Sequence, residues 1–205
     1  MLAMRVFVPL ILACTAALLA TSLGAGSFSL AAETPAQTES ASLTTPKQRL
    51  DALFADLKKE RDADKARELA NQIRVEWQDS GSATVNLLMQ WADKAITDNK
   101  QAAALDILDQ VITLAPNYVE GWNRRATLHY AMGNYRKSMS DINRVLAIEP
   151  RHFGALAGMA AILDASGKDE LAMRAWEQFL NIYPADRKAQ ERLGELAEKL
   201  AGSKT

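Results

Sequence analysis

The chain has 205 residues, with 24 basic and 25 acidic side chains that give a formal net charge of −1. This balance leaves no basic stripe able to neutralise a run of phosphates, so nucleic acid is not expected as the main ligand. The only cysteine, Cys14, lies in an apolar N-terminal segment. A chain that loses this segment offers no disulfide, thiol nucleophile or metal thiolate.

Residues 1–32 have the three parts of a secretory signal peptide. Their only charge is Arg5, an apolar run of 18 residues follows at 6–23, and small residues complete the segment. We expect cleavage at about Ala31 or Ala32, and therefore a periplasmic or secreted protein. Two alternatives stay open. The apolar run is just long enough to span a bilayer as an uncleaved anchor, and its cysteine faintly resembles a lipoprotein acylation site.

The next two segments are a tether and a pair of helices. Residues 33–46 are rich in Thr, Ser, Ala, Gln and Pro, which predicts a disordered linker. Residues 47–84 contain two stretches whose apolar residues share one helical face. They form either a degenerate copy of the repeats described below or a plain helical hairpin that caps the first full repeat. The apolar positions are Leu50, Leu53, Phe54 and Leu57 in the first stretch, and Ala66, Leu69, Ala70, Ile73 and Trp77 in the second.

Three segments of 34 residues then follow without insertion, at 85–118, 119–152 and 153–186. Small residues recur at positions 8 and 20 of each segment, and large apolar residues at positions 4, 24 and 27. Two helices that cross closely need small residues at the crossing and large apolar residues around it. Each segment is therefore expected to form a helix A and a helix B. The small residues are Ala92, Ala126, Ala160, Ala104, Ser138 and Ala172.

The turn and the end of each segment carry their own signals. Position 15, between the helices, needs a residue that tolerates positive φ. Position 32 is proline, which cannot continue helix B. The turn residues are Asn99, Gly133 and Gly167, and the prolines are Pro116, Pro150 and Pro184.

With a period of 34 residues, this pattern resembles the tetratricopeptide repeat (TPR). The resemblance implies an all-α fold, a right-handed superhelical solenoid of helix–turn–helix repeats. Residues 187–205 are expected to form a capping helix and a tail, with Leu193, Leu196 and Leu200 on one face. A solenoid exposes its last apolar face unless a helix with a polar outer side covers it.

No nucleophile motif, phosphate loop, zinc-ligand spacing or pair of catalytic carboxylates stands out, so we expect no enzyme, no metal and no cofactor. The only histidines, His129 and His152, lie too far apart in the repeat scheme to share a metal, and we expect structural roles for both. Arg125 stands where the repeat family normally has an apolar residue. We hypothesise that it pairs with Asp106 or Asp109 on the preceding helix B.

The resemblance also implies where a partner binds, because helix A lines the concave face in this family. Amide and guanidinium groups there can bond a peptide backbone or a carboxylate, and small side chains can admit an apolar anchor. The predicted groove residues are Asn86, Met89, Gln90 and Asp93 in the first repeat, Glu120, Asn123, Arg124, Thr127 and Tyr130 in the second, and Ala157, Gly158 and Ala161 in the third.

These features predict a non-enzymatic adaptor of the bacterial cell envelope that holds a protein or peptide segment of another envelope protein in its concave groove. The alternative is a membrane-tethered assembly factor with an uncleaved N-terminal anchor, which docks a complex through its convex face. The segments around Trp122 and Phe153 also resemble small exported bacterial TPR proteins of undefined role, and this resemblance supports the compartment rather than an activity.

Overall fold

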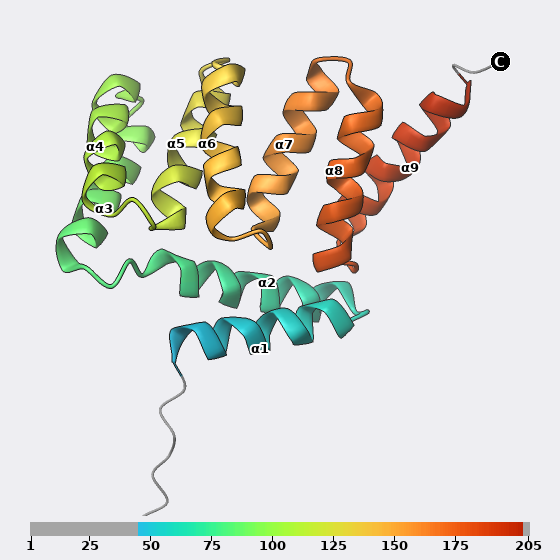
Figure 1. Ribbon diagram of the computed structural model, residues 1–205, viewed down its shortest axis with the longest axis horizontal. Helices are drawn as coiled ribbons and strands as arrows, with labels where there is room; N and C mark the ends of the chain where they lie inside the picture. The colour runs from blue at the N-terminus through green and yellow to red at the C-terminus, as the bar shows by residue number, and fades with distance from the viewer. Residues whose placement is uncertain (1–44, 203–205) are drawn as a thin grey trace, which may run out of the picture. The chain divides into compact units, whose positions relative to one another are not determined.

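The computed structural model describes residues 45–202, which form nine α-helices and no strand (Figure 1). The all-α repeat fold is thereby confirmed. The predicted signal peptide and most of the predicted linker lie outside the described residues, and no described helix is long and apolar enough to cross a membrane. The helices are α1 Pro46–Lys59, α2 Ala63–Gln78, α3 Ala83–Thr97, α4 Gln101–Leu114, α5 Val119–Ala131, α6 Tyr135–Ile148, α7 Phe153–Ala165, α8 Asp169–Ile182 and α9 Arg187–Gly202.

The pairs α3–α4, α5–α6 and α7–α8 are the three repeat hairpins, each packed through its small residues. All six predicted small residues are buried. The hydroxyl of Ser138 donates to the carbonyl oxygen of Ala126 at 2.8 Å, so the one polar residue among them is satisfied inside the crossing. The turn residues also have the predicted backbone, with φ of 58° at Asn99, 74° at Gly133 and 67° at Gly167.

The two helices predicted in residues 47–84 are present as the α1–α2 hairpin, but this hairpin does not cap the first repeat. It runs across the repeats and packs on α7 and α8 (Figure 1). Its buried side chains, including Phe54 and Trp77, share a core with Phe153 and Phe179. The turn between α2 and α3 redirects the chain: Gly81 has φ of 74°, and the turn is held by hydrogen bonds to the Asn86 side chain.

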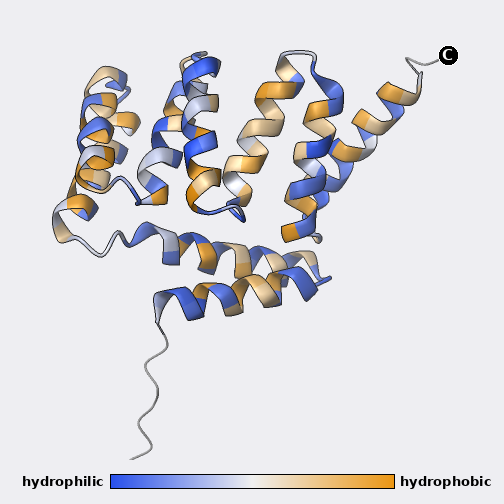
Figure 2. Cartoon of the chain, in the orientation of Figure 1, coloured by the Kyte–Doolittle hydropathy of each residue, from blue (hydrophilic) through white to orange (hydrophobic). Residues whose placement is uncertain are grey.

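At the other end of the array, helix α9 lies where a capping helix is predicted. Helix α9 packs on α8, with Ala189 and Leu196 buried and the ammonium group of Lys199 2.8 Å from the Asp169 carboxylate. Helix α7 packs against the second repeat, α8 and the α1–α2 hairpin, and it is apolar over most of its surface (Figure 2). That composition suits a helix covered on several sides by other helices.

Candidate functional site

Three neighbouring cavities follow the A helices α3, α5 and α7, with volumes of about 340, 170 and 110 Å³. Gln78, Glu120 and Arg124 line both the first and the second cavity. Asn123 and Gly154 line both the second and the third. The three cavities therefore form one continuous surface feature, which we call the helix groove.

Most of the predicted groove residues meet in this feature, although they come from three different repeats. Ala157 and Ala161 line none of the three cavities, and Ala157 packs against the core shared with the α1–α2 hairpin. The predicted residues that line the helix groove are Asn86, Met89, Gln90, Asp93, Glu120, Asn123, Arg124, Thr127, Tyr130 and Gly158.

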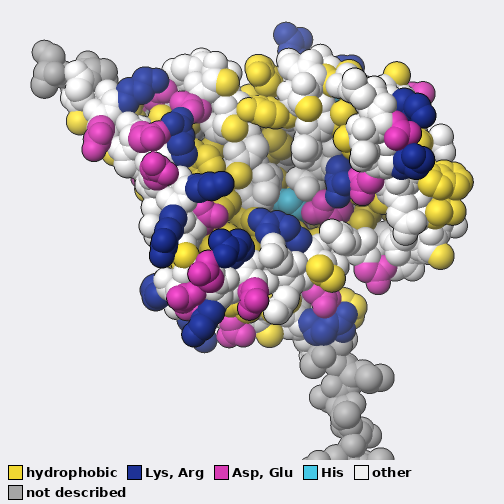
Figure 3. Space-filling model, turned by 180° about the vertical axis from the view of Figure 1, so that it is seen from behind, with side chains coloured by type: hydrophobic (Ala, Val, Ile, Leu, Met, Phe, Trp, Pro, Cys, Tyr) yellow, Lys and Arg dark blue, Asp and Glu magenta, His cyan; other side chains and the backbone are white. Residues whose placement is uncertain are grey.

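Helix α2 forms one wall of the helix groove, which sequence reasoning missed. Val75 and Gln78 line the first cavity, and Arg74 and Trp77 line the second. Seen from behind, the molecule is hollowed between the hairpin and the repeats, with a histidine in the depth and charged side chains around it (Figure 3). No local sequence pattern predicts that α2 lines the helix groove, because its position depends on packing between residues far apart in the sequence.

A buried acid–histidine pair lies at the centre of the helix groove. Glu120 is 7% exposed and His152 is 1% exposed, and His152 Nε2 is 3.0 Å from Glu120 Oε1. His152 Nδ1 accepts a hydrogen bond from the backbone N–H of Ala155, so Nε2 carries the proton that it donates to the carboxylate. The imidazole thus caps α7, in agreement with the expected structural role. Trp77 stacks on it, with ring centroids 4.1 Å apart.

Two opposing effects act on the Glu120 carboxyl. Burial raises its pKa, but hydrogen bonds from His152 and from Asn123, the latter at 3.0 Å, hold the pKa below its usual value. The group is therefore a charged acceptor whose two oxygens are both engaged. It positions the side chains around it rather than offering a free carboxylate to a ligand.

Other groove residues are paired in the same way. Arg124 forms an ion pair with Asp93 across the first two repeats. The Asn86 side chain donates to the Asp79 carboxylate and accepts from Ser80, so it holds the α2–α3 turn. A ligand must therefore exchange with these pairs or bind at their outer atoms.

The third cavity is smaller and has an apolar floor. A Cβ on Gly158 would lie 3.3 Å from Ile142 Cδ1, so the missing side chain keeps this floor open. Thr127 and the exposed ring of Tyr130 stand on its α5 side. This part of the helix groove can receive a small apolar side chain.

Arg125 forms the predicted contact between repeats and a second contact that was not predicted. Its guanidinium lies 2.6 Å from Asp109 Oδ1 on α4 and makes two further bonds of 2.7 and 2.8 Å to the buried Asp141 on α6. The bonds to Asp141 and then to Asp109 raise the pKa of Arg125. The hypothesis is confirmed for Asp109, whereas Asp106 is not a partner.

The other histidine lies outside the helix groove. His129 is buried on α5, and its Nδ1 finds no hydrogen-bond partner among the described residues. Burial lowers its pKa. Within residues 45–202, no group of three or more His, Cys, Asp or Glu side chains is placed to hold a metal ion.

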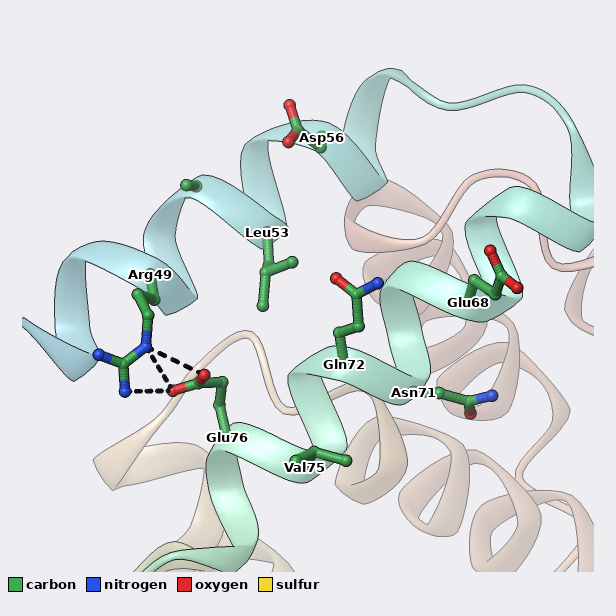
Figure 4. A pocket seen from close by; sticks show the side chains of 9 residues that line it. Arg49, Leu53, Asp56, Glu68, Asn71, Gln72, Val75 and Glu76 are labelled. Atoms are coloured by element: carbon green, nitrogen blue, oxygen red, sulfur yellow. Dashed lines mark hydrogen bonds and ion pairs between the residues drawn. The ribbon is translucent and has the colours of Figure 1, made fainter. Parts of the chain in front are cut away.

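A separate depression of about 750 Å³ lies between α1 and α2. Figure 4 shows the ion pair of Arg49 and Glu76, at 3.0 Å, which joins the two helices at one end of it. Leu53 and Val75 supply apolar surface there. None of the predicted groove residues lines this depression.

Comparisons with known proteins agree with this architecture. No family model matches the chain. A TPR repeat-containing protein of Rhizobium etli is 68% identical over 162 residues, which are 79% of each chain. The first TPR domain of Spaghetti (RPAP3), solved with the HSP90 peptide SRMEEVD, superposes with a TM-score of 0.55 at 22% identity, over 60% of this chain and 96% of that one. MamA gives a TM-score of 0.52 at 15% identity, over 73% and 82%. At such identities the two structures show the fold.

Proposed function

Because the chain belongs to the tetratricopeptide-repeat proteins, we propose that it is a non-enzymatic adaptor that holds a segment of another cell-envelope protein in the helix groove. The observation that carries the proposal is the continuity of three cavities along α3, α5 and α7. A row of connected small cavities suits an extended chain, whose successive side chains can each enter one of them.

The charges of the helix groove indicate the chemistry of the segment. Asp79, Asp93 and Glu120 line the first cavity, and Arg124 is its only basic residue. The Spaghetti domain is solved with a peptide that contains two glutamates and a C-terminal aspartate. Such a peptide would meet excess negative charge here, and like charges brought together disfavour binding. The proposed segment therefore places a Lys or Arg at the first cavity and a small apolar side chain at the third.

The envelope location is part of the proposal and rests on the signal-peptide pattern of residues 1–32. N-terminal sequencing of the exported protein tests it. A start at Ala32 or Glu33 supports a soluble envelope adaptor. An intact start at Met1 or Met4 favours instead the membrane-tethered assembly factor that docks through its convex face.

The binding role is tested by the double variant Asn123→Ala with Arg124→Ala, used as bait in affinity capture from envelope extracts. Both side chains are half-buried in the helix groove and outside the hydrophobic cores. A charge-assisted hydrogen bond contributes about 1.5–3 kcal/mol, so partner recovery should fall at least about tenfold.

The matched control is Arg136→Ala with Lys137→Ala, two exposed residues of α6. Its partner recovery should equal that of the wild type, and both double variants should keep the helical circular dichroism. The reverse pattern, with recovery lost only in the α6 variant, would reject the helix groove in favour of the convex face.

A further inference from the structure

The first repeat exposes large apolar side chains at the end of the array. On α3, Leu87 is 44% exposed and Trp91 is 53% exposed, and on α4, Leu114 is 60% exposed. Apolar side chains also gather on this end in the view from behind, at the right of Figure 3. We call Leu87 and Trp91 the end face.

The corresponding positions of later repeats show what such residues normally do. Leu87 corresponds to the buried Gly121, where a Cβ would come within 2.7 Å of Val111 Cγ1 in the preceding helix B. Trp91 corresponds to Arg125, which bonds Asp109 of that same helix. In the third repeat, the residue corresponding to Leu87 is also buried, in the core shared with the second repeat. The end face is thus a repeat-stacking surface that lacks its preceding hairpin.

Within residues 45–202, nothing covers this surface. The α1–α2 hairpin, which precedes it in sequence, shares a core with α7 and α8. It is also held on the turn before α7, by the stacking of Trp77 on His152 and by an ion pair of 2.7 Å between Arg151 and Asp51. The opposite end of the array is closed by α9, whose outer side carries charged residues. A second copy therefore offers no apolar stacking surface at its α9 end.

We propose that two copies of the chain associate through their end faces, α3 of one copy against α3 of the other. A two-fold contact buries the same surface on both copies and closes the assembly at a dimer. The contact would cover, on each copy, the surface that a preceding hairpin covers in the later repeats. Tryptophan is also enriched among the residues that dominate binding energy at interfaces.

The charges next to the end face permit such a self-contact. Lys94, one turn beyond Trp91, forms an ion pair of 3.3 Å with Asp98, which also binds Lys100 at 3.1 Å. These charges are compensated within each copy. Between Leu87 and Trp91, α3 carries no charged residue, so two copies can meet without opposing like charges at the centre.

The test is the mass of the full chain in solution, measured by light scattering and sedimentation over a range of concentrations. The wild type should form a dimer, and Leu87→Glu with Trp91→Glu should weaken the dimer at least about a hundredfold, because two buried apolar contacts become charged on each copy. The control Leu171→Glu changes a side chain that is 45% exposed on α8 and should leave the dimer intact. All variants should keep the helical circular dichroism.

A second measurement locates the contact. In a Cys14→Ser background, Leu87→Cys should be joined to its own counterpart by a short bismaleimide reagent, because residues near a two-fold axis face themselves. Leu171→Cys should not be joined. A wild type that stays monomeric overturns the proposal, whether the end face is open or is covered by another protein or by the chain's own hairpin. A dimer that resists the glutamate variants, or that fails to link at position 87, also overturns it. These outcomes are independent of partner capture in the helix groove.

Discussion

The α1–α2 hairpin and the three repeat hairpins are built from similar sequence and packed in different ways. Both use small residues where helices cross, such as Ala66 in α2 and Ala104 in α4. The repeats stack on their sequence neighbours, whereas the hairpin crosses the array and joins its core to α7 and α8. Periodicity thus specifies how a hairpin is built, and side chains distant in sequence specify where it docks.

The largest effect on stability is expected from removing α9, which packs on α8 at the end of the array. Deleting residues 185–205 removes α9 and the buried side chains of Ala189 and Leu196, and uncovers part of α8. We expect a loss of about 5 kcal/mol or more in unfolding free energy, since each large apolar side chain contributes about 1.5–3 kcal/mol, together with aggregation. Denaturant unfolding and light scattering measure both effects. A monomeric truncation with unchanged stability would show that α9 is not a cap.

The long-range contact is tested by Trp77→Ala, which removes the ring that packs on Phe54, His152 and Phe153. The cost should be about 3–5 kcal/mol, as for other buried aromatic side chains. Val75→Ala on the same helix is the control, because Val75 is largely exposed and should change stability by less than about 0.5 kcal/mol. Equal effects of the two variants would mean that the hairpin is not docked on the repeats.

A polar contact between repeats should have a smaller effect. Arg125→Met leaves the buried carboxylate of Asp141 without its two hydrogen bonds. We expect a loss of about 2–3 kcal/mol in thermal or denaturant unfolding, somewhat less than for a fully buried pair because Arg125 is partly exposed. The double variant Arg125→Met with Asp141→Leu should recover part of it. Unchanged or raised stability of Arg125→Met would remove the energetic role of this contact.

How much the sequence could predict follows the same division between local and distant contacts. The positive φ of Asn99 and the contact of Arg125 with Asp109 could be predicted, because the turn and the neighbouring repeat lie at fixed positions of the 34-residue period. The bond between Glu120 and His152 was not predictable, because their separation by 32 residues becomes proximity only through the repeat geometry. The α2 wall was harder still, since the ion pair between Asp51 and Arg151 joins residues 100 apart. The end face is exposed because the α1–α2 hairpin packs on other repeats instead of on α3.

The smallest effect concerns pH. The pKa of Glu120 in the folded chain lies below its ordinary value of 4.5, since burial, which raises it, is outweighed by the hydrogen bonds from His152 and Asn123. A lowered folded pKa contributes stability above the unfolded pKa and loses it as the pH falls through the folded value. Below a pH of about 4.5, the stability difference between wild type and Glu120→Gln should shrink. A difference that stays constant with pH contradicts the assigned role.

The central claim is that α2, although it belongs to the displaced hairpin, forms one wall of the partner-binding groove. A photo-reactive amino acid placed at Gln78 of α2 tests this claim directly, with Thr127 of α5 as the reference and Glu68, on another part of α2, as the control. The account predicts that positions 78 and 127 crosslink to the same partner segment and that position 68 does not. Crosslinking at position 127 without any at position 78, or equal crosslinking at positions 78 and 68, would contradict it.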